Sequence, residues 1–351
     1  MMKILHAADL HLDTAFSGRS EAQVRYLRQA LLEVPRKLAE LCRREGCHMM
    51  LLSGDLFDGP WTQNSLDVLR SALEEAAVPV FISPGNHDFC GAGSPYLTEN
   101  WPRNVHIFTR PEMESVVVEN LDCRVYGAGY RSMDCPPLLE DFRAEGEERY
   151  HVAVLHGDPT QATSPYSPIT TGQVRESGLH YIALGHVHKS GSLRAGETLC
   201  AWPGCPMGRG YDELETKGVL IVTVEDTAEA VFVPLGTPRF YDLETSPSRL
   251  ADVLPAVGND HFYRITLTGE SPELDLAAMM AQWEQFPNLE LRDRTVPEVD
   301  IWGSADADSL EGAYFRILKE AMEGADEQTR QELELAARIS RKILDGQEVV
   351  L

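Results

Sequence analysis

The segment "VPVFISPGNHD" (residues 78–88) runs from an apolar stretch into three polar residues, Asn86, His87 and Asp88. The apolar half predicts a buried strand, and Pro84-Gly85 predicts a turn at its end. A turn alone does not need side chains that can bind a metal ion or transfer a proton, whereas all three of these side chains can do one or the other. The segment therefore predicts a functional site at the carboxyl end of a strand, if partner residues lie elsewhere in the chain.

Two earlier segments repeat this design. "KILHAADL" (3–10) and "HMMLLSGD" (48–55) are apolar runs that end in acidic residues, and residues 20–45 and 62–77 have the apolar spacing of helices. Pro35 should kink or divide the first helix, because proline lacks the amide hydrogen that a helix interior needs. Alternating strands and helices predict an α/β sandwich, in which ligands bind outside the carboxyl ends of the strands.

From about residue 105 the chain is rich in expected strands. "HVAVLHGD" (151–158) and "HYIALGHVHK" (180–189) again place histidines after apolar runs, and residues 218–235 predict a hairpin. A proline-rich crossing is expected at 236–247, and we place a domain boundary near residue 240.

This boundary divides the chain into a first domain at 1–240 and a smaller second domain at 241–351. In the second domain, residues 261–270 predict a small sheet, and residues 309–323 and 327–344 predict two amphipathic helices. Asp308 and Glu311 fit a capping box before the first of them. The apolar stripe of these helices is expected to be core, with a partner surface as the alternative; it comprises Leu310, Phe315, Ile317, Leu318, Met322, Leu333, Leu335, Ile339 and Ile343.

The composition is typical of a globular protein, with 43% hydrophobic and 25% charged residues in 351. No apolar run approaches 18 residues, and "MMKILHAADLHLD" reaches His and Asp too early for a signal peptide, so a cytoplasmic protein without a membrane segment is expected. The cysteines lack the spacing of a zinc knuckle or a disulfide framework, and buried thiols are expected at Cys42, Cys47, Cys90, Cys123, Cys135, Cys200 and Cys205.

The groups at the expected strand ends form a possible metal centre: Asp9, His11, Asp55, Asn86, His87, Asp88, His156, His186 and His188. Divalent cations bind anionic oxygens and neutral imidazoles. Asp9 and His11 are two residues apart and can chelate one metal. Asp55 follows Gly54, so its carboxylate can approach closely and bridge two metals.

Five motifs carry a family resemblance. "ADLHLD", "SGDLFD", "PGNHD", "LHGD" and "ALGHVHK" resemble, in this order and over residues 1–190, the motifs of the calcineurin-like metallophosphoesterases. The resemblance implies a four-layer α/β/β/α sandwich. It also implies two metal ions, one held by Asp9, His11, Asp55 and His188, and the other by Asp55, Asn86, His156 and His186.

The resemblance also assigns the remaining two residues of the opening segment. His87 resembles the proton donor of the family, and we expect Asp88 to hydrogen-bond its imidazole and fix the tautomer. Asp58, in "GDLFD", is expected only to cap its loop or to bond a ligand histidine. Because the expected ligands are nitrogen and oxygen atoms, manganese is the expected metal, with iron and zinc as alternatives.

The substrate class rests on finer resemblances. Asp58-Gly59-Pro60 stands where protein phosphatases of the superfamily carry Asp-Arg-Gly, which argues against that branch. "GDLFD", "YIALGHVHK" and residues 201–224 look instead like the DNA-repair nucleases of the SbcD type, and residues 233–244 resemble the entry to their capping domain. This branch implies DNA as substrate, a coiled-coil ATPase of the SbcC type as partner and a homodimer through helix 62–77. A phosphodiesterase for nucleotide or lipid-head diesters is the alternative.

The acidic balance opposes the DNA hypothesis. The net charge is −24, of which residues 241–351 contribute −13 (10 basic minus 23 acidic) and the rest −11. Such a surface repels nucleic acid. Two metal ions and the residues Lys189, Arg131, Arg209, Arg25 and Arg28 are expected to offset this repulsion at the site.

Overall fold

The computed structural model describes residues 1–297 and 300–346. Its contacts divide the chain into one unit formed by residues 1–242 and 260–263, and a second formed by residues 243–259 and the described residues from 264 onward. Residues 298–299 and 347–351, which belong to the predicted second domain, lie outside the described residues. That the first unit is catalytic and the second a cap for it stays a prediction.

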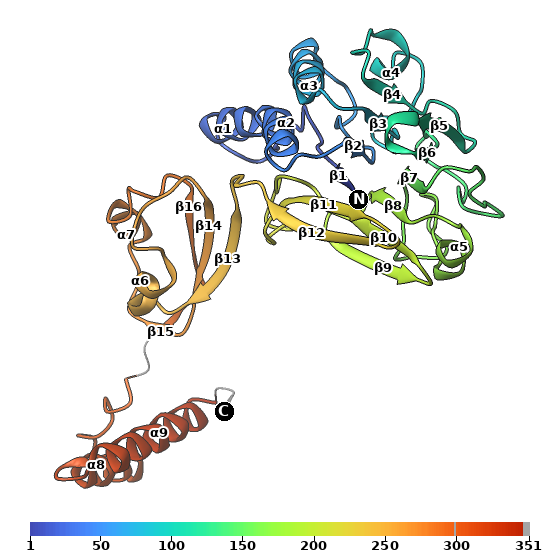
Figure 1. Cartoon of the computed structure of the whole chain (residues 1–351). Helices are drawn as coiled ribbons and strands as arrows, with labels where there is room; N and C mark the ends of the chain where they lie inside the picture. The colour runs from blue at the N-terminus through green and yellow to red at the C-terminus, as the bar shows by residue number, and fades with distance from the viewer. Residues whose placement is uncertain (298–299, 347–351) are drawn as a thin grey trace. The chain divides into compact units, whose positions relative to one another are not determined.

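The first sheet consists of β12 (Ala228–Pro234), β11 (Gly218–Val224), β1 (Met2–Ala7), β2 (Met49–Leu52), β3 (Val80–Ile82) and β4 (Val105–Ile107), in this spatial order. Strands β1 to β4 run parallel, and β11 joins β1 antiparallel. The carboxyl ends of β1, β2 and β3 therefore lie at one edge of the sheet, as the sequence predicts (Figure 1).

Three helices pack against the outer face of this sheet: α1 (Glu21–Leu32), α2 (Val34–Arg44) and α3 (Gln63–Ala76) (Figure 1). The expected first helix is divided, as predicted, because Pro35 occupies the first turn of α2, where its missing amide hydrogen is not needed. Ser20 and Thr62 begin α1 and α3 as capping boxes with Gln23 and Ser65.

The second sheet has the order β5 (Glu114–Val118), β6 (Cys123–Gly127), β7 (Tyr150–His156), β8 (Tyr181–Gly185), β10 (Thr198–Trp202) and β9 (Gly191–Ala195). Helix α5 (Thr171–Glu176) packs against its outer face. The β9–β10 hairpin was not predicted, because Ser192 and Arg194 leave β9 without an apolar run.

The two sheets face each other across a buried apolar core. Along β1, Ile4 points into this inter-sheet core while its neighbour Leu5 points to the helices, as the two-residue period of a strand requires. On the second sheet, Val154 faces the inter-sheet core and Leu155 faces the α5 side. The resulting layers are helix, sheet, sheet and helix, which confirms the predicted α/β/β/α sandwich.

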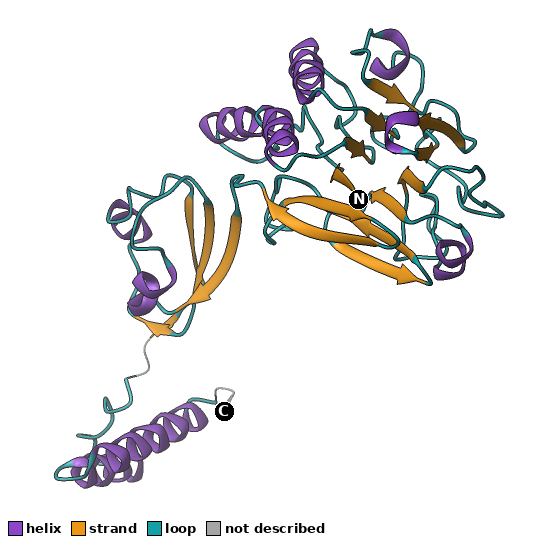
Figure 2. Cartoon of the chain, viewed as in Figure 1, coloured by secondary structure: helices purple, strands orange, loops and turns teal. Residues whose placement is uncertain are grey.

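The three-stranded sheet that follows consists of β13 (Phe240–Thr245), β14 (Phe262–Leu267) and β16 (Leu289–Asp293), accompanied by α6 (Leu250–Val253) and α7 (Leu276–Ala281) (Figure 2). Two two-residue strands, β15 (Glu270–Ser271) and β17 (Val296–Pro297), pair in parallel as a separate sheet. The crossing expected at 236–247 is wrong in part, because β13 lies within it. Pro238 and Pro247 flank this strand, so neither removes a hydrogen-bond donor from it.

Two C-terminal helices, α8 (Leu310–Met322) and α9 (Glu327–Leu344), form an antiparallel pair. The predicted capping box is wrong by one residue, since Ser309 rather than Asp308 caps α8 by accepting a hydrogen bond from the Gly312 amide. The core prediction for their apolar stripe holds only in part. Phe315 is fully buried, whereas Leu310 is 90% exposed and Ile343 62% exposed.

Two expectations about the whole chain can be compared with the structure. All seven cysteines are free and buried, as predicted. Within residues 1–297 and 300–346, no helix combines the length and the apolarity that a membrane span requires.

Candidate metal centre

The loops that follow β1 and β2 lie side by side. The amide of Asp9 donates to the Gly54 carbonyl (3.0 Å), and the amide of His11 donates to the Asp55 carbonyl (2.9 Å). Asp9, His11 and Asp55 all have left-handed backbone conformations, with φ of 54°, 48° and 52°. Such conformations cost about 1–3 kcal/mol each and persist only where the surroundings impose them. The fold thus holds two predicted ligand loops in strained but defined positions.

Asp88 fastens the β2 loop to the β3 loop. Its buried carboxylate accepts hydrogen bonds from the amides of Leu56 (2.6 Å) and Gly85 (2.8 Å), and from the Tyr96 hydroxyl (2.5 Å). The Asp55 amide approaches the same carboxylate at 3.3 Å. Buried amides need such partners, so Asp88 satisfies donors that would otherwise lack them.

The hydrogen bond expected between Asp88 and the His87 imidazole is therefore wrong. Asp58 occupies the position instead, with its Oδ1 atom 3.1 Å from His87 Nδ1 and 3.4 Å from His11 Nδ1. This hydrogen bond raises the pKa of His87, and the two imidazoles hold the pKa of Asp58 well below its usual range. Of the two roles that the sequence left open for Asp58, a loop cap or a partner of a ligand histidine, the contact with His11 agrees with the second. That His11 binds a metal stays a prediction.

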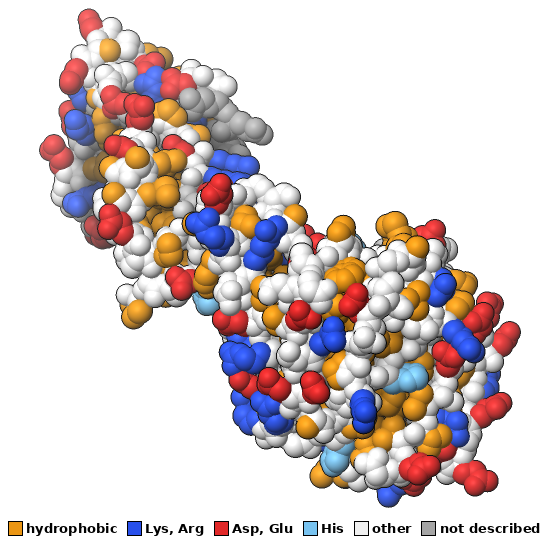
Figure 3. All heavy atoms as spheres, turned by 90° about the horizontal axis from the view of Figure 1, so that it is seen from above, with side chains coloured by type: hydrophobic (Ala, Val, Ile, Leu, Met, Phe, Trp, Pro, Cys, Tyr) orange, Lys and Arg blue, Asp and Glu red, His pale blue; other side chains and the backbone are white. Residues whose placement is uncertain are grey.

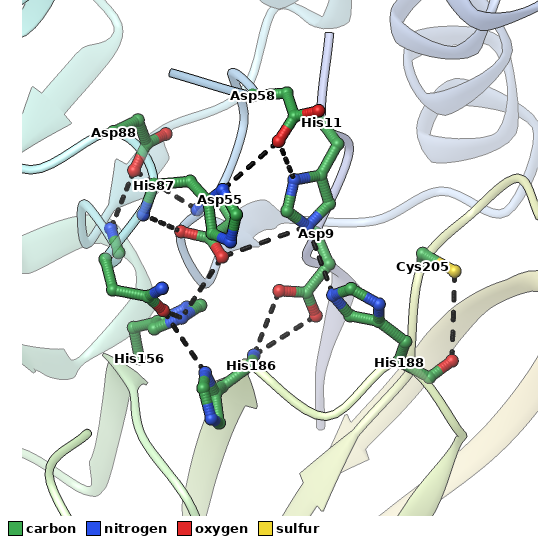
Figure 4. Close-up of polar contacts among 12 residues, drawn as sticks. Asp9, His11, Asp55, Asp58, His87, Asp88, His156, His186, His188 and Cys205 are labelled. Carbon is green, nitrogen blue, oxygen red and sulfur yellow. Dashed lines mark hydrogen bonds and ion pairs between the residues drawn. The ribbon is translucent and has the colours of Figure 1, made fainter. Parts of the chain in front are cut away.

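One half of the centre gathers Asp9, His11 and His188, which come from the loops after β1 and β8 (Figure 4). His11 Nε2 lies 3.1 Å from His188 Nε2, and suitable ligand atoms of all three residues lie within 4.8 Å of one another. His188 Nδ1 faces Glu213 Oε1 at 2.7 Å. The ring of His188 is thus oriented by a carboxylate behind it, the usual arrangement for a metal-binding histidine.

The other half gathers Asn86, His156 and His186. Asn86 Oδ1 lies 2.9 Å from His156 Nε2 and 3.2 Å from His186 Nδ1. The amide of His186 donates to the Asp9 carboxylate at 2.9 Å, which connects the two halves (Figure 4).

Asp55 lies between the two halves. Its Oδ2 atom is 3.8 Å from His11 Nε2 and 3.5 Å from His156 Nε2, while its Oδ1 atom accepts a hydrogen bond from the His87 amide at 2.9 Å. All side chains predicted as ligands are therefore brought together at one edge of the sandwich, from segments that are up to 179 residues apart in sequence (Asp9 to His188).

Burial sets the protonation of this cluster. It raises the pKa of Asp9 and of Asp55 to about 6 each, because a buried carboxylate loses hydration. It lowers the pKa of His11 to about 3 and that of His186 to about 4. Near neutral pH Asp9 and Asp55 are therefore largely deprotonated and His11 and His186 neutral, the forms that bind divalent cations.

His156 provides a test of whether a metal fits. Its Nδ1 atom lies 2.9 Å from the Ser53 carbonyl oxygen, which can only accept, so the ring proton is on Nδ1. Burial lowers the pKa of His156, so the ring is neutral and Nε2 carries a lone pair. That lone pair faces the oxygens of Asn86 and Asp55, an arrangement that is repulsive unless a cation lies among the three atoms. The donor set therefore fits a divalent metal.

Glycines allow this close packing. A Cβ atom on Gly85 would lie 2.3 Å from Asp55 Oδ1, and one on Gly54 would lie 2.6 Å from His156 Nδ1. A Cβ atom on Gly185, which precedes His186, would lie 1.9 Å from the Ser53 carbonyl oxygen.

Sequence reasoning missed Glu213. The residue is buried, and its carboxylate also accepts hydrogen bonds from the Arg209 amide (2.8 Å) and guanidinium (3.0 Å). Burial opposes its ionisation, but the contacts with His188 and Arg209 outweigh this effect and hold its pKa below the usual range. The segment "YDELETKG" contains several acidic residues, and nothing in the sequence alone distinguishes Glu213 from Asp212 or Glu215.

The sequence matches a known family and several relatives. The family described as "Calcineurin-like phosphoesterase" matches residues 2–190. A Bacillus subtilis protein named "Uncharacterized metallophosphoesterase YhaO" is 32% identical over 239 residues, which are 64% of this chain but only 57% of that protein, less than two thirds of its length.

Two further relatives are named as the SbcD component of the nuclease SbcCD. The protein from Staphylococcus epidermidis is 22% identical over 335 residues, covering 82% of this chain and 84% of its own length. The protein from Bacillus subtilis is 25% identical over 276 residues, covering 66% of this chain and 68% of its own length.

The glycine contacts lead to a stability prediction. Gly185→Ala should lower the free energy of unfolding by about 1–3 kcal/mol, since the new methyl group would overlap a backbone oxygen that cannot move aside. Gly172→Ala is the matched control, because its Cβ atom meets only Thr170 Oγ1 at 3.8 Å and alanine favours the helix. Denaturant unfolding of both variants measures the difference. Equal stability of Gly185→Ala and the original chain would contradict the packing described.

Proposed function

The chain belongs to the calcineurin-like phosphoesterase family, and from that premise we propose that it is a metal-dependent phosphodiesterase that cleaves DNA. It would act as the exonuclease or endonuclease component of an SbcCD-type repair complex. A phosphodiesterase for nucleotide or lipid-head diesters is the second candidate.

The environment of His156 is the observation that carries the metal-dependent part. A neutral imidazole whose lone pair faces the oxygens of Asn86 and Asp55 at 2.9 and 3.5 Å is repelled by them, and positive charge among the three atoms would relieve this repulsion. Hydrogen bonding within the chain does not supply that charge, because the proton of His156 is already donated to Ser53.

We assign the ligands of two metal ions on this basis, with Asp55 shared: Asp9, His11, Asp55 and His188 for one, and Asp55, Asn86, His156 and His186 for the other. When bound, two divalent cations supply the charge that activates water for attack on phosphorus and that offsets the charge developing on the phosphate. The proposed metal is manganese, since the donors are nitrogen and oxygen; iron and zinc accept the same donors.

The chain's own residues handle the proton of the leaving group. His87 has its Nδ1 atom against Asp58, so its Nε2 atom is free to donate to the departing oxygen. The His87 side chain is 45% exposed, whereas that of His188 is 28% exposed and those of Asp9, His11, Asp55, Asn86 and His156 are buried, so His87 is accessible to a substrate. Asp58 orients the ring. Asp88 acts indirectly, by fixing the backbone on which Asp55 and His87 are placed.

DNA is proposed as the substrate because two relatives are named as nuclease components, and in each the match extends over most of the relative's length. The surface charge opposes this assignment. Three of the basic residues expected near the site are ion-paired: Arg25 with Glu21, Lys189 with Glu215 and Arg209 with Glu213. On the face that Figure 3 shows, basic side chains are interspersed with acidic ones. We therefore expect the isolated chain to bind DNA weakly and to cleave it slowly.

A partner protein would supply the positive charge that attracts DNA. The exposed apolar residues of α8 and α9, which include Leu310, Ile317, Leu335 and Ile343, support docking of a coiled-coil ATPase of the SbcC type on this helix pair. The homodimer through α3 and the cytoplasmic location remain predictions.

An activity assay separates the two candidates. The chain, loaded with Mn²⁺, should hydrolyse bis-p-nitrophenyl phosphate and labelled linear DNA, and excess chelator should abolish both reactions because the charge among the ligands is removed. Hydrolysis of small diesters without any cleavage of DNA, even with the ATPase partner present, would favour the second candidate. No hydrolysis of any diester with Mn²⁺, Fe²⁺ or Zn²⁺ would contradict the proposed function.

His87→Ala tests the proton transfer. This variant should keep its metal content, because the assigned ligands are untouched, and lose about 10²–10⁴-fold in kcat towards diesters with poor leaving groups. Metal analysis of the purified variant beside its rate is the measurement. A fully active variant, or one that has lost its metals, would refute the assigned role.

A further inference from the structure

A pocket opens beside His87. It has a volume of about 400 Å³ and is formed by the loop after β2 and the loop between β3 and α4 (Pro95–Thr98). Its lining includes Phe57, Pro60, Trp61, His87, Phe89 and Ser94. A volume of this size is typical of sites for small organic ligands.

The lining combines Trp61 and Phe89, with Phe57 buried behind them, and small glycine, proline and alanine residues; it is uncharged apart from the edge formed by His87 and Asp88. No lysine or arginine is among the described residues that line it. Since Asp88 is buried and bonded to backbone amides, it does not present a free charge to a ligand. The lining thus suits a planar, uncharged group and offers nothing to bind a phosphate.

The aromatic walls are held in place. Trp61 Nε1 donates to the Gly93 carbonyl at 3.2 Å, which ties one loop to the other and fixes the indole. A Cβ atom on Gly91 would lie 2.6 Å from the Phe89 ring, so glycine there lets the ring pack closely. The Ser94 hydroxyl is buried and has no hydrogen-bond partner among the described residues.

We infer that this pocket binds a nucleobase, that of the nucleotide whose oxygen departs from the scissile phosphate. The inference rests on the proposed phosphodiesterase function and adds a base-recognition site to it. His87 lines the pocket and is also the proposed proton donor to the leaving oxygen. The part of the substrate that occupies the pocket is therefore the part that carries the leaving oxygen. Bases stack on aromatic side chains with little dependence on their identity. The base can come from a DNA strand or from a free nucleotide diester.

Dinucleotides that lack one base provide the test. Thymidylyl-thymidine is compared with two analogues in which the base is missing on the leaving side or on the retained side. Trp61→Ala should lower kcat/KM for the complete dinucleotide by about 5- to 100-fold, the effect expected for one lost stacking contact. The same substitution should have a much smaller effect on the analogue that lacks the leaving-side base, because the contact is already absent.

Two variants control the experiment. Trp61→Phe keeps an aromatic wall and should retain most of the preference for the leaving-side base. Trp283→Ala removes a partly exposed tryptophan that does not line the pocket and should leave the preference unchanged. If Trp61→Ala reduces the rate equally for all three substrates, or the base preference lies on the retained side, the inference is overturned.

The experiments distinguish failure of the base-binding inference from failure of the proposed phosphodiesterase function. If the wild-type chain hydrolyses bis-p-nitrophenyl phosphate but shows no preference for a base, the phosphodiesterase stands and the pocket assignment falls. If no diester is hydrolysed, calorimetry with thymidine 5′-monophosphate and deoxyribose 5-phosphate decides: tighter binding of the nucleotide that Trp61→Ala abolishes supports the pocket, and equal binding of both overturns it. Comparing the dinucleotide with a single-stranded oligonucleotide then identifies the source of the base.

Discussion

The burial of Asp9 and Asp55 among neutral imidazoles is the constraint on which the rest of the site depends. Burial is the largest of the effects that raise the pKa of each carboxylate to about 6. Each carboxylate accepts one backbone amide, from His186 or His87, and the remaining atoms around Asp55 include the Nε2 atoms of His11 and His156. His156 directs a lone pair at Asp55 and Asn86, and His11 directs Nε2 at the Nε2 atom of His188. A chain that folds in this way provides binding sites for cations. Bound cations activate water and stabilise the negative charge that develops on a phosphate, which is the chemistry of the family.

The fold keeps this unfavourable cluster together by interactions outside it. Left-handed backbone at Asp9, His11, Asp55 and His186 costs free energy, which the paired loops and the buried sandwich offset. Asp88 contributes by binding the amides of two loops at once, and Glu213 contributes by orienting His188 from behind. Residues that never touch the metal positions therefore determine where the ligands lie.

The sequence predicted the ligand cluster and the sandwich because both leave local signals. Apolar runs of strand length that end in Asp, Asn or His mark the sheet edge, and the two-residue period of the strands determines the layers. It assigned the contact with the His87 imidazole to Asp88 instead of Asp58, since both acids follow ligand-rich turns and only the direction of each side chain shows which one reaches His87. Glu213 and the pocket around Trp61 depend on contacts between distant loops, for which a single sequence carries no signal. The strand β13 was missed because its flanking prolines suggested an irregular segment.

The metal positions themselves provide the most direct measurement. Crystals soaked in manganese, with data collected at the manganese absorption edge, should show two anomalous peaks about 3.5–4 Å apart on either side of the Asp55 carboxylate. Saturating manganese that leaves this position without peaks, or that binds only beside Glu213 and Cys205 or beside Asp58 and His87, would contradict the account.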